Sequence, residues 1–398
     1  MARALSKVLP ACLGLALALG CERKTDQIRI GGVAPLTGDG ATFGISARRG
    51  FEMAVAEWNA RGGVLGKPIK LFVADDKGDP GEGATAVMML IHQRKVAGVV
   101  GPAMTKVSLA GAPIAQSAGI PLIASASTNL KVTQVGDFIF RACFVDPFQG
   151  SAGAGFAFHE LKARKAACLF DLGNDYTAGI SEVFKATFTR LGGDVAAYEG
   201  HASGTPDFRV QLTKILRTGP DLIYAPGFYG DAALITRQAR ELGFRGPVLG
   251  ADGWDSPRLV ELGGPSMENT FFTTFFSHED PSPTVQNFVG AFKAKHGEPP
   301  DGHATMGYEA AMILLDGIRR AGTTDGRAVR DAIARTDLRL VTGRVTFDPQ
   351  RNPIKPIVFM EIKGGRRMFR STRLPDPSQA QDSTVPVPRE ESGMHSWR

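Results

Sequence analysis

The chain has 398 residues, of which 43% are hydrophobic and 22% charged, and its formal net charge is +6. This composition excludes a disordered or fibrous protein, and the length is sufficient for two globular domains. Basic and acidic residues are interspersed along the chain, so the modest positive charge does not indicate nucleic-acid binding, and no nucleic-acid partner is expected.

The N-terminus is organised as an export signal. Arg3 and Lys7 form a basic start, and residues 8–19 form an apolar run that is too short to span a bilayer. Gly20 and Cys21 follow this run. The ending ALALGC resembles a bacterial lipobox, in which the cysteine is lipidated and becomes the new N-terminus of the mature protein.

We therefore expect residues 1–20 to be a signal peptide that is cleaved before Cys21, and residues 21–26 to be a lipidated tether. The protein is then a lipoprotein that is anchored to a membrane and faces the periplasm. Ala18 stands where leucine is most usual in a lipobox, so ordinary cleavage and a free periplasmic protein is the alternative. After processing, Cys143 and Cys168 remain, and their spacing does not distinguish a disulfide from two buried thiols.

From residue 27 onward, short apolar runs alternate with helical segments. Most of the runs are continuously apolar, which is typical of parallel strands that are buried on both faces. The predicted strands are 28–36, 69–76, 96–102, 120–127, 138–144, 166–173, 221–228 and 247–253. This alternation predicts an α/β fold with doubly wound, mainly parallel sheets.

Two helices have clear boundary signals. The segment 43–63 places apolar residues at positions i, i+3, i+4 and i+7 and ends in two glycines, as an amphipathic helix does. The next helix begins after Asp79, which precedes Pro80 and Glu82 in a capping arrangement.

Doubly wound sheets bind ligands outside the carboxyl ends of their strands. The strand ends that carry small or polar residues are 101–105, 124–128, 171–179, 225–231 and 250–257. They come from both halves of the chain, which predicts a cleft between two lobes. The second of these ends, ASAST, offers hydroxyl groups and small side chains that let a ligand approach the backbone.

Several motifs in a fixed order carry a family resemblance: APLTGDGATFG, ADDKGDP, GVVGP, IPLIASAST, NDYTAG, DLIYAPGFYGD and GADGWDSP. In this order they resemble the periplasmic leucine/isoleucine/valine-binding protein family, the type I periplasmic binding proteins of branched-chain amino acid ABC transporters. The resemblance extends over about residues 27–370. It implies a two-lobed clamshell whose chain crosses between the lobes near residues 144–147, 274–278 and 341–347.

These crossings make each lobe discontinuous in sequence. Lobe one is expected to comprise residues 27–145 plus 276–343, and lobe two residues 146–275 plus 344–373. The tail, residues 374–398, is rich in proline and serine and has no apolar period, so we expect it to be disordered.

The resemblance also implies the ligand site. The hydroxyls of Thr105 and Thr128 are expected to bind the carboxylate of an amino acid. The carbonyl of Ala126 and the carboxylate of Asp252 are expected to hold its ammonium group. The full set of candidate ligand-binding residues is Phe43, Thr105, Ala126, Ser127, Thr128, Tyr176, Phe228 and Asp252.

Alternatives and departures accompany this assignment. Thr105 and Ser127 have a second interpretation as caps of the helices that follow their strands. Leucine-binding members of the family have tyrosine where this chain has Phe228 and glutamate where it has Asp252, so the ligand need not be leucine. A larger or differently functionalised amino acid, or a bridging water, is compatible with these changes.

No enzyme motif is present in the sequence. There is no dinucleotide-binding loop after a strand, no Walker A motif and no nucleophile elbow. The segment beginning at His159 resembles a metalloprotease helix but has Ala163 in place of the second histidine. We therefore expect no catalytic residue, no metal and no cofactor.

The expected function is that of a solute-binding protein, a monomer that delivers a small amino acid to the permease and ATPase subunits of an ABC transporter. The alternatives are a ligand-sensing receptor that acts through a membrane partner, and binding of an amide, urea or a small carboxylate.

Overall fold

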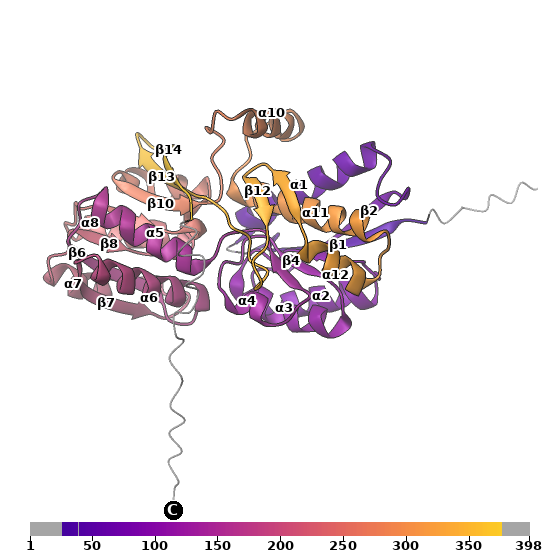
Figure 1. The fold of residues 1–398 in the computed structure, drawn as a ribbon. Coiled ribbons are helices and arrows are strands. Elements are labelled where there is room, and N and C mark those ends of the chain that lie inside the picture. The colour runs from indigo at the N-terminus through magenta and orange to yellow at the C-terminus, as the bar shows by residue number, and fades with distance from the viewer. Residues whose placement is uncertain (1–25, 39, 376–398) are drawn as a thin grey trace, which may run out of the picture.

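The computed structural model describes residues 26–38 and 40–375, which form two lobes connected by several chain segments (Figure 1). Each lobe is built on its own sheet. The predicted signal peptide, Cys21 and residues 376–398 of the predicted tail lie outside the described residues. Within the described ranges, no helix combines the length and apolarity needed to cross a membrane.

The first lobe contains a five-stranded sheet in the order β2-β1-β3-β4-β5, in which all neighbours are parallel. Its strands are β1 (Ile28–Ala34), β2 (Ile69–Asp75), β3 (Val99–Val100), β4 (Leu122–Ala124) and β5 (Ile139–Arg141). Its helices are α1 (Ala41–Ala60), α2 (Pro80–His92), α3 (Thr105–Ala118), α4 (Lys131–Gln134), α11 (Gly302–Ala321) and α12 (Gly326–Ala334). A small antiparallel pair of strands, β11 (Asp337–Leu340) and β12 (Gly343–Thr346), also belongs to this lobe. Helix α10 (Pro283–His296) lies between β10 of the second lobe and α11 in the chain.

The second lobe contains a seven-stranded sheet in the order β14-β13-β10-β9-β8-β6-β7. Its strands are β6 (Lys165–Asp171), β7 (Asp194–His201), β8 (Leu222–Tyr224), β9 (Val248–Gly250), β10 (Thr270–Thr274), β13 (Ile357–Lys363) and β14 (Arg366–Arg373). Only the β10–β13 and β13–β14 pairs are antiparallel. Its helices are α5 (Asp146–His159), α6 (Asp175–Arg190), α7 (Arg209–Arg217), α8 (Tyr229–Glu241), η1 (Asp252–Trp254), α9 (Arg258–Gly263) and η2 (Gly264–Met267). The predicted α/β class with mainly parallel sheets is confirmed.

Local signals in the sequence account for the helix ends. Helix α1 ends at Ala60 and is followed by Gly62 and Gly63, whose φ angles of 96° and 79° favour glycine. Helix α2 begins after Asp79, whose carboxylate accepts hydrogen bonds from the amides of Gly81 and Glu82. Both predicted boundaries are confirmed.

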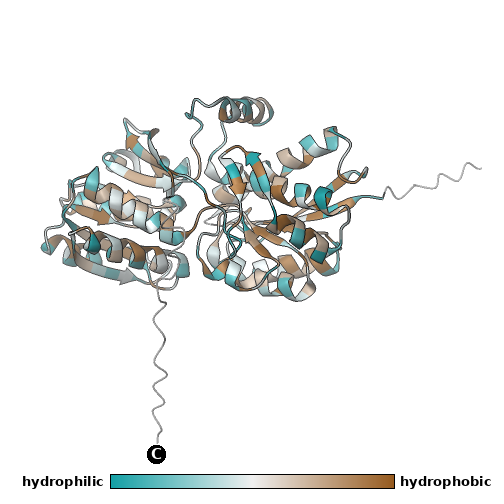
Figure 2. Cartoon of the chain, viewed as in Figure 1, coloured by the Kyte–Doolittle hydropathy of each residue, from teal (hydrophilic) through white to brown (hydrophobic). Residues whose placement is uncertain are grey.

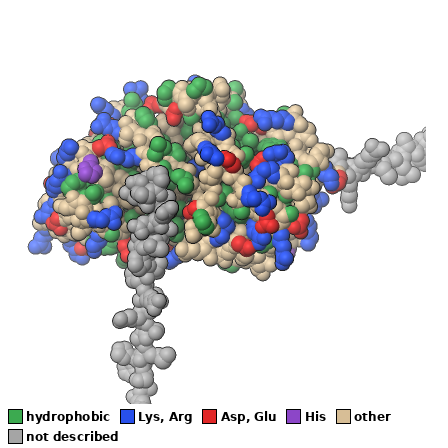
Figure 3. Space-filling model, in the orientation of Figure 1, with side chains coloured by type: hydrophobic (Ala, Val, Ile, Leu, Met, Phe, Trp, Pro, Cys, Tyr) green, Lys and Arg blue, Asp and Glu red, His purple; other side chains and the backbone are tan. Residues whose placement is uncertain are grey.

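Each lobe has an apolar interior and a charged surface. Hydrophobic residues concentrate in the central strands and on the helix faces that cover them (Figure 2). On the face shown in Figure 3, basic and acidic side chains are mixed rather than separated into large areas of one sign. Burial of the apolar faces explains why the continuously apolar runs of the sequence form the parallel strands.

Helices α1 and α11, which are far apart in sequence, pack closely because each contributes a glycine to the contact. A Cβ atom on Gly50 of α1 would lie 2.1 Å from the carbonyl oxygen of Ala304. A Cβ atom on Gly307 of α11 would lie 2.4 Å from the carbonyl oxygen of Ala47. This close approach places the first turn of α11 beside the first turns of α1.

The third connection between the lobes lies later than the sequence suggests. We expected it near residues 341–347, but Arg351 still donates hydrogen bonds to the backbone oxygens of Ile139 and Thr133 in the first lobe. Phe347 also packs against Phe140 of β5. The chain therefore leaves the first lobe after Asn352, because its side-chain contacts hold residues 347–352 against β5.

Candidate functional site

A narrow cavity lies between the two lobes. The first lobe supplies the loop after β3, the loop after β4, and the first turns of α1 and α11. The second lobe supplies the first turns of α6, α8 and η1. The lining residues are Phe43, Ala103, Met104, Thr105, Ala126, Thr128, Tyr176, Phe228, Asp252, Gly253 and His303. Seven of the eight residues predicted from the sequence are therefore brought together.

The loop after β4 presents Ala126 and Thr128 to the cavity, and both residues are buried. Arg141, itself fully buried at the end of β5, fixes this loop by donating hydrogen bonds of 2.6 and 2.7 Å to the backbone oxygens of Ser127 and Asn129. Thr105 faces the same space from the first turn of α3, and it does not cap that helix, whose N-cap is Met104. The capping alternative for Thr105 is therefore wrong.

Ser127 does not line the cavity, contrary to its place among the predicted site residues. Its hydroxyl lies 2.7 Å from the hydroxyl of Ser108 and 3.3 Å from the backbone oxygen of Pro102. Alternation along the extended loop explains the difference, because successive side chains point to opposite sides. Ser127 thus ties the loop to α3, while Ala126 and Thr128 face the cavity.

Asp252 is held at the opposite side of the cavity by two side chains of the second lobe. Its Oδ1 accepts a 2.7 Å hydrogen bond from the hydroxyl of Tyr176 and another of 2.7 Å from Nε2 of Gln149. The hydroxyl of Tyr176 in turn accepts a hydrogen bond from the amide of Gly253. Burial raises the pKa of the Asp252 carboxyl, although both side-chain hydrogen bonds oppose the shift. A cation that entered the cavity would stabilise the ionised form of this group.

The apolar wall is formed by aromatic rings from both lobes. Phe43 of α1 crosses to the second lobe and packs at 5.9 Å from the ring of Phe228 and edge-on at 5.2 Å from that of Tyr229. The ring of Tyr176 stacks on that of Phe228, with 5.8 Å between the ring centroids. Phe43, Tyr176 and Phe228, three of the predicted site residues, therefore form one wall of the cavity.

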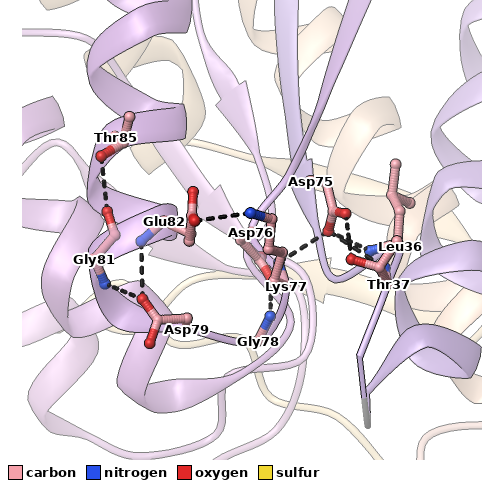
Figure 4. A network of polar contacts seen from close by, with 10 residues as sticks. All are labelled: Leu36, Thr37, Asp75, Asp76, Lys77, Gly78, Asp79, Gly81, Glu82 and Thr85. Atoms are coloured by element: carbon pink, nitrogen blue, oxygen red, sulfur yellow. Dashed lines mark hydrogen bonds and ion pairs between the residues drawn. The ribbon is translucent and has the colours of Figure 1, made fainter.

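The turn before α1 is fixed by an Asp75 network, which is shown in Figure 4. The carboxylate of Asp75 accepts hydrogen bonds from the amide of Leu36, the hydroxyl of Thr37 and the amide of Lys77. Glycine is required just beyond this turn, because a Cβ atom on Gly44 would lie 1.8 Å from the carbonyl oxygen of Pro35. The network therefore positions the helix turn that carries Phe43.

Polar contacts also join the lobes on either side of the cavity. Lys131 of α4 forms a 2.6 Å ion pair with Asp175 of α6, and Asn129 donates a 2.9 Å hydrogen bond to the backbone oxygen of Asp175. The hydroxyl of Ser256 donates to that of Thr42 at 3.1 Å. Together with the contacts of Phe43, these polar contacts show that the two lobes touch each other beside the cavity.

Sequence reasoning missed two polar residues of the site. His303 lines the cavity from the first turn of α11, and Gln149 of α5 supports Asp252. The histidines were dismissed because they are scattered in the sequence. For His303, the sequence offers one weak signal: a polar residue at the start of a helix that follows a predicted crossing between the lobes.

The structure places no redox or metal centre in the described ranges. Cys143 and Cys168 are both free and buried, which decides between the two alternatives left open above, and burial raises the pKa of the Cys143 thiol to about 12. No cluster of three or more His, Cys, Asp or Glu residues in the described part of the chain could hold a metal ion.

The chain is similar to known proteins over most of its length. Residues 27–366 match the family described as "Periplasmic binding protein". The chain is 30% identical to Leu/Ile/Val-binding protein homolog 2 of Brucella abortus over 89% of this chain and 95% of the relative.

Two solved structures share the fold. The leucine-binding protein LivK of Thermotoga maritima has a TM-score of 0.84 and 37% identity, with 88% of this chain and 99% of that chain covered. The branched-chain amino acid binding protein LivJ of Streptococcus pneumoniae, in complex with isoleucine, has a TM-score of 0.82 and 30% identity, with 88% and 100% covered. With its two lobes, the cavity between them and a family match over most of its length, the chain belongs to the periplasmic binding protein family.

Proposed function

We propose that this protein captures a small amino acid in the interlobe cavity and delivers it to the permease of an ABC transporter. The observation that carries the proposal is the placement of opposite chemistry on opposite lobes. Thr105 and Thr128 present hydroxyls from the first lobe, and Asp252 presents a carboxylate from the second. A zwitterion that leaves water needs both kinds of partner, because its two charges must be met by hydrogen bonds.

In this proposal each residue of the site has one role. The hydroxyls of Thr105 and Thr128 bind the α-carboxylate, and the carbonyl of Ala126 together with Asp252 binds the ammonium group. Tyr176 and Gln149 orient Asp252 by occupying its Oδ1. Phe43 and Phe228 contact the side chain of the ligand.

Membership in the family implies an extracytoplasmic location, and its members are binding proteins. We extend this to binding without catalysis, to a lipid anchor at Cys21 and to a monomer that docks on permease and ATPase subunits. Contacts from both lobes are available together only when the cleft is closed, so ligand binding shifts the population towards the closed form. The permease then receives the ligand when the cleft reopens.

A thermal-shift screen of the chain without its first 21 residues tests the proposal. The compounds are the standard amino acids, simple amides, urea and small carboxylates. A ligand present at 100 times its Kd raises the free energy of unfolding by about 2.7 kcal/mol, which is readily measured as a higher melting temperature. Stabilisation by amides or carboxylates and by no amino acid would contradict the proposal.

The Asp252→Asn variant then tests the ammonium contact. It keeps the shape of the side chain and removes its charge, so it should weaken binding of the amino acid by about tenfold to a hundredfold. Binding of an analogue that lacks the amino group should change much less. Equal losses for the two compounds would show that Asp252 does not hold an ammonium group.

A further inference from the structure

His303 is a buried histidine in the cavity wall whose ring nitrogens have no hydrogen-bond partner. Only 3% of the residue is exposed, and neither Nδ1 nor Nε2 makes a hydrogen bond within the protein. Buried polar groups are nearly always paired, because an unpaired one loses its hydrogen bonds to water without replacement. An unpaired imidazole that lines a cavity therefore indicates a partner that enters the cavity.

The surrounding contacts hold the ring of His303 in place. It stacks on Phe43 with 4.2 Å between centroids and an interplanar angle of 29°, and it lies edge-on to Phe275 at 5.8 Å. These apolar neighbours fix the plane of the ring but satisfy neither nitrogen. They are ring contacts that a phenylalanine at position 303 would make equally well, so packing alone does not explain a histidine there.

His303 and the groups assigned to the zwitterion belong to one cavity but to different segments. Thr105, Ala126 and Thr128 come from the ends of β3 and β4, Asp252 comes from the second lobe, and His303 comes from α11. Of the remaining lining side chains, Phe43, Ala103, Met104 and Phe228 are apolar. Tyr176 has a hydroxyl, but this group is bound to Asp252. His303 is thus the polar group left for the ligand's side chain.

Charge near His303 favours a neutral partner. Asp252 lines the same cavity, and Asp301 is the N-cap of α11, two positions before His303. A carboxylate on the ligand side chain would enter a cavity that the Asp252 carboxyl already lines. A hydroxyl or a carboxamide can pair with an imidazole nitrogen whether that nitrogen donates or accepts, because such groups both donate and accept hydrogen bonds.

We infer that His303 is a specificity-determining residue that hydrogen-bonds a hydroxyl or carboxamide on the side chain of the bound amino acid. The preferred ligand is then an amino acid with a short, neutral and polar side chain rather than an aliphatic one. This inference rests on the proposed function, since it presupposes that an amino acid occupies the cavity. It adds the side-chain class, which the zwitterion contacts leave open.

Titration calorimetry with ligands of equal shape tests the inference. Threonine and valine form one matched pair, and asparagine and leucine form the other. In each pair only the first carries polar atoms at the end of its side chain. The wild type should bind the polar member of at least one pair about tenfold more tightly or better, because the apolar member leaves the imidazole unpaired.

Two variants separate hydrogen bonding from packing. His303→Phe keeps the ring against Phe43 and should lose the preference for the polar ligand, or reverse it. His303→Gln retains a donor and an acceptor and should restore part of the preference. The exposed His159 provides a control, since His159→Gln should bind as the wild type does.

The melting temperature of the free protein supplies a second readout. His303→Phe removes two unpaired buried nitrogens, so the ligand-free variant should be at least as stable as the wild type. Marked destabilisation of His303→Phe would show that the imidazole has a structural role and would overturn the inference.

The binding outcomes distinguish this inference from the proposed function. Tighter binding of valine and leucine than of threonine and asparagine, or an unchanged preference in His303→Phe, overturns the inference and leaves amino-acid capture standing. If no standard amino acid binds the wild type, both the inference and the proposed function are overturned.

Discussion

The hydroxyl of Tyr176 donates a 2.7 Å hydrogen bond to Oδ1 of Asp252, although the two residues are 76 positions apart in the sequence. Tyr176 stands at the start of α6, and Asp252 begins η1 beyond β9. Because both strands that precede these residues, β6 and β9, are parallel members of one sheet, their carboxyl ends meet at the same edge. The bond therefore orients the carboxylate before any ligand arrives.

Removing this bond should weaken ligand binding without removing the wall of the cavity. Tyr176→Phe keeps the ring that stacks on Phe228 but leaves Asp252 with Gln149 alone. We expect the affinity for the amino acid identified by screening to fall about tenfold to a hundredfold, the cost of one hydrogen bond to a charged group. Titration calorimetry measures it. Tyr198→Phe, on β7 of the same lobe, should bind normally, and an equal loss in both variants would refute the positioning role.

The Lys131–Asp175 ion pair joins the lobes and should favour the closed form. Lys131→Glu places two like charges together across the opening, so the free protein should become more open and bind its ligand a few times more weakly. X-ray scattering in solution reports the radius of gyration. The control is Lys77→Glu, which breaks an ion pair inside the first lobe and should leave both quantities unchanged. The closure mechanism is wrong if saturating ligand does not reduce the radius of gyration of the wild type. It is also wrong if Lys131→Glu has the same radius of gyration and the same affinity as the wild type.

The stability of the fold should depend on pH through Asp76. Burial raises the pKa of this carboxyl to about 7, and only Oδ1 accepts a hydrogen bond, from the amide of Gly78 (Figure 4). In the unfolded chain the pKa of this carboxyl is about 3.9. Between about pH 3.9 and pH 7, the folded state therefore keeps Asp76 protonated while the unfolded state does not. Its contribution to the free energy of unfolding is therefore largest at low pH and declines as the pH rises towards 7.

Asp76→Asn removes this titration. Between pH 5 and pH 8 the wild type should lose about 2 kcal/mol of unfolding free energy relative to the variant. Urea denaturation at the two pH values gives the difference, and Asp194→Asn, at an exposed position, should follow the wild type. Parallel pH profiles for wild type and Asp76→Asn would show that Asp76 does not titrate in this range.

The buried pair of Lys355 and Glu309 should contribute strongly to stability. Lys355 lies in the third connection between the lobes and contacts Glu309 of α11 and the hydroxyl of Thr342, with both charged side chains almost fully buried. Lys355→Met leaves the Glu309 carboxylate without its cation, which typically costs about 3 to 5 kcal/mol. Urea denaturation checks this loss, with the exposed Lys363→Met as control. The double variant Lys355→Met with Glu309→Leu should recover much of it, and full additivity of the two losses would contradict the pairing.

The proposed lipid anchor is tested by fractionation of a bacterial host that expresses the full chain. Cys21→Ser removes the thiol to which the lipid would be attached through a thioether. The protein should therefore move from the membrane fraction to the soluble periplasm, while its affinity for the ligand stays the same. Cys12→Ser changes a residue that the signal peptidase would discard and should remain in the membrane fraction. Equal membrane retention of Cys21→Ser and wild type would exclude lipidation at this position.

Much of the architecture was determined by the sequence alone, because the signals that specify it are local. Continuous apolar runs identified the buried parallel strands, since both faces of such a strand are covered by helices. Asp79 and the glycine pair after α1 marked helix ends, because capping and positive φ angles depend on neighbouring residues. The edge strands β7 and β14 were missed, since half-exposed and charged strands lack the continuous apolar pattern, and β10 and β13 were missed although both are largely buried.

The tertiary structure decided which residues meet. The strand-end rule and the family resemblance led to seven lining residues, but nothing near Gln149 or His303 in sequence indicates that Gln149 supports Asp252 or that His303 lines the cavity. Gln149 reaches Asp252 across 103 positions, and His303 reaches Phe43 because α1 and α11 pack through facing glycines. Likewise, the hydroxyl of Ser127 points away from the cavity and contacts that of Ser108. Arg351 holds the third connection against β5 through its hydrogen bond to the backbone oxygen of Ile139. Such contacts depend on the packing of distant segments, whereas strand, cap and turn signals depend on the adjacent chain.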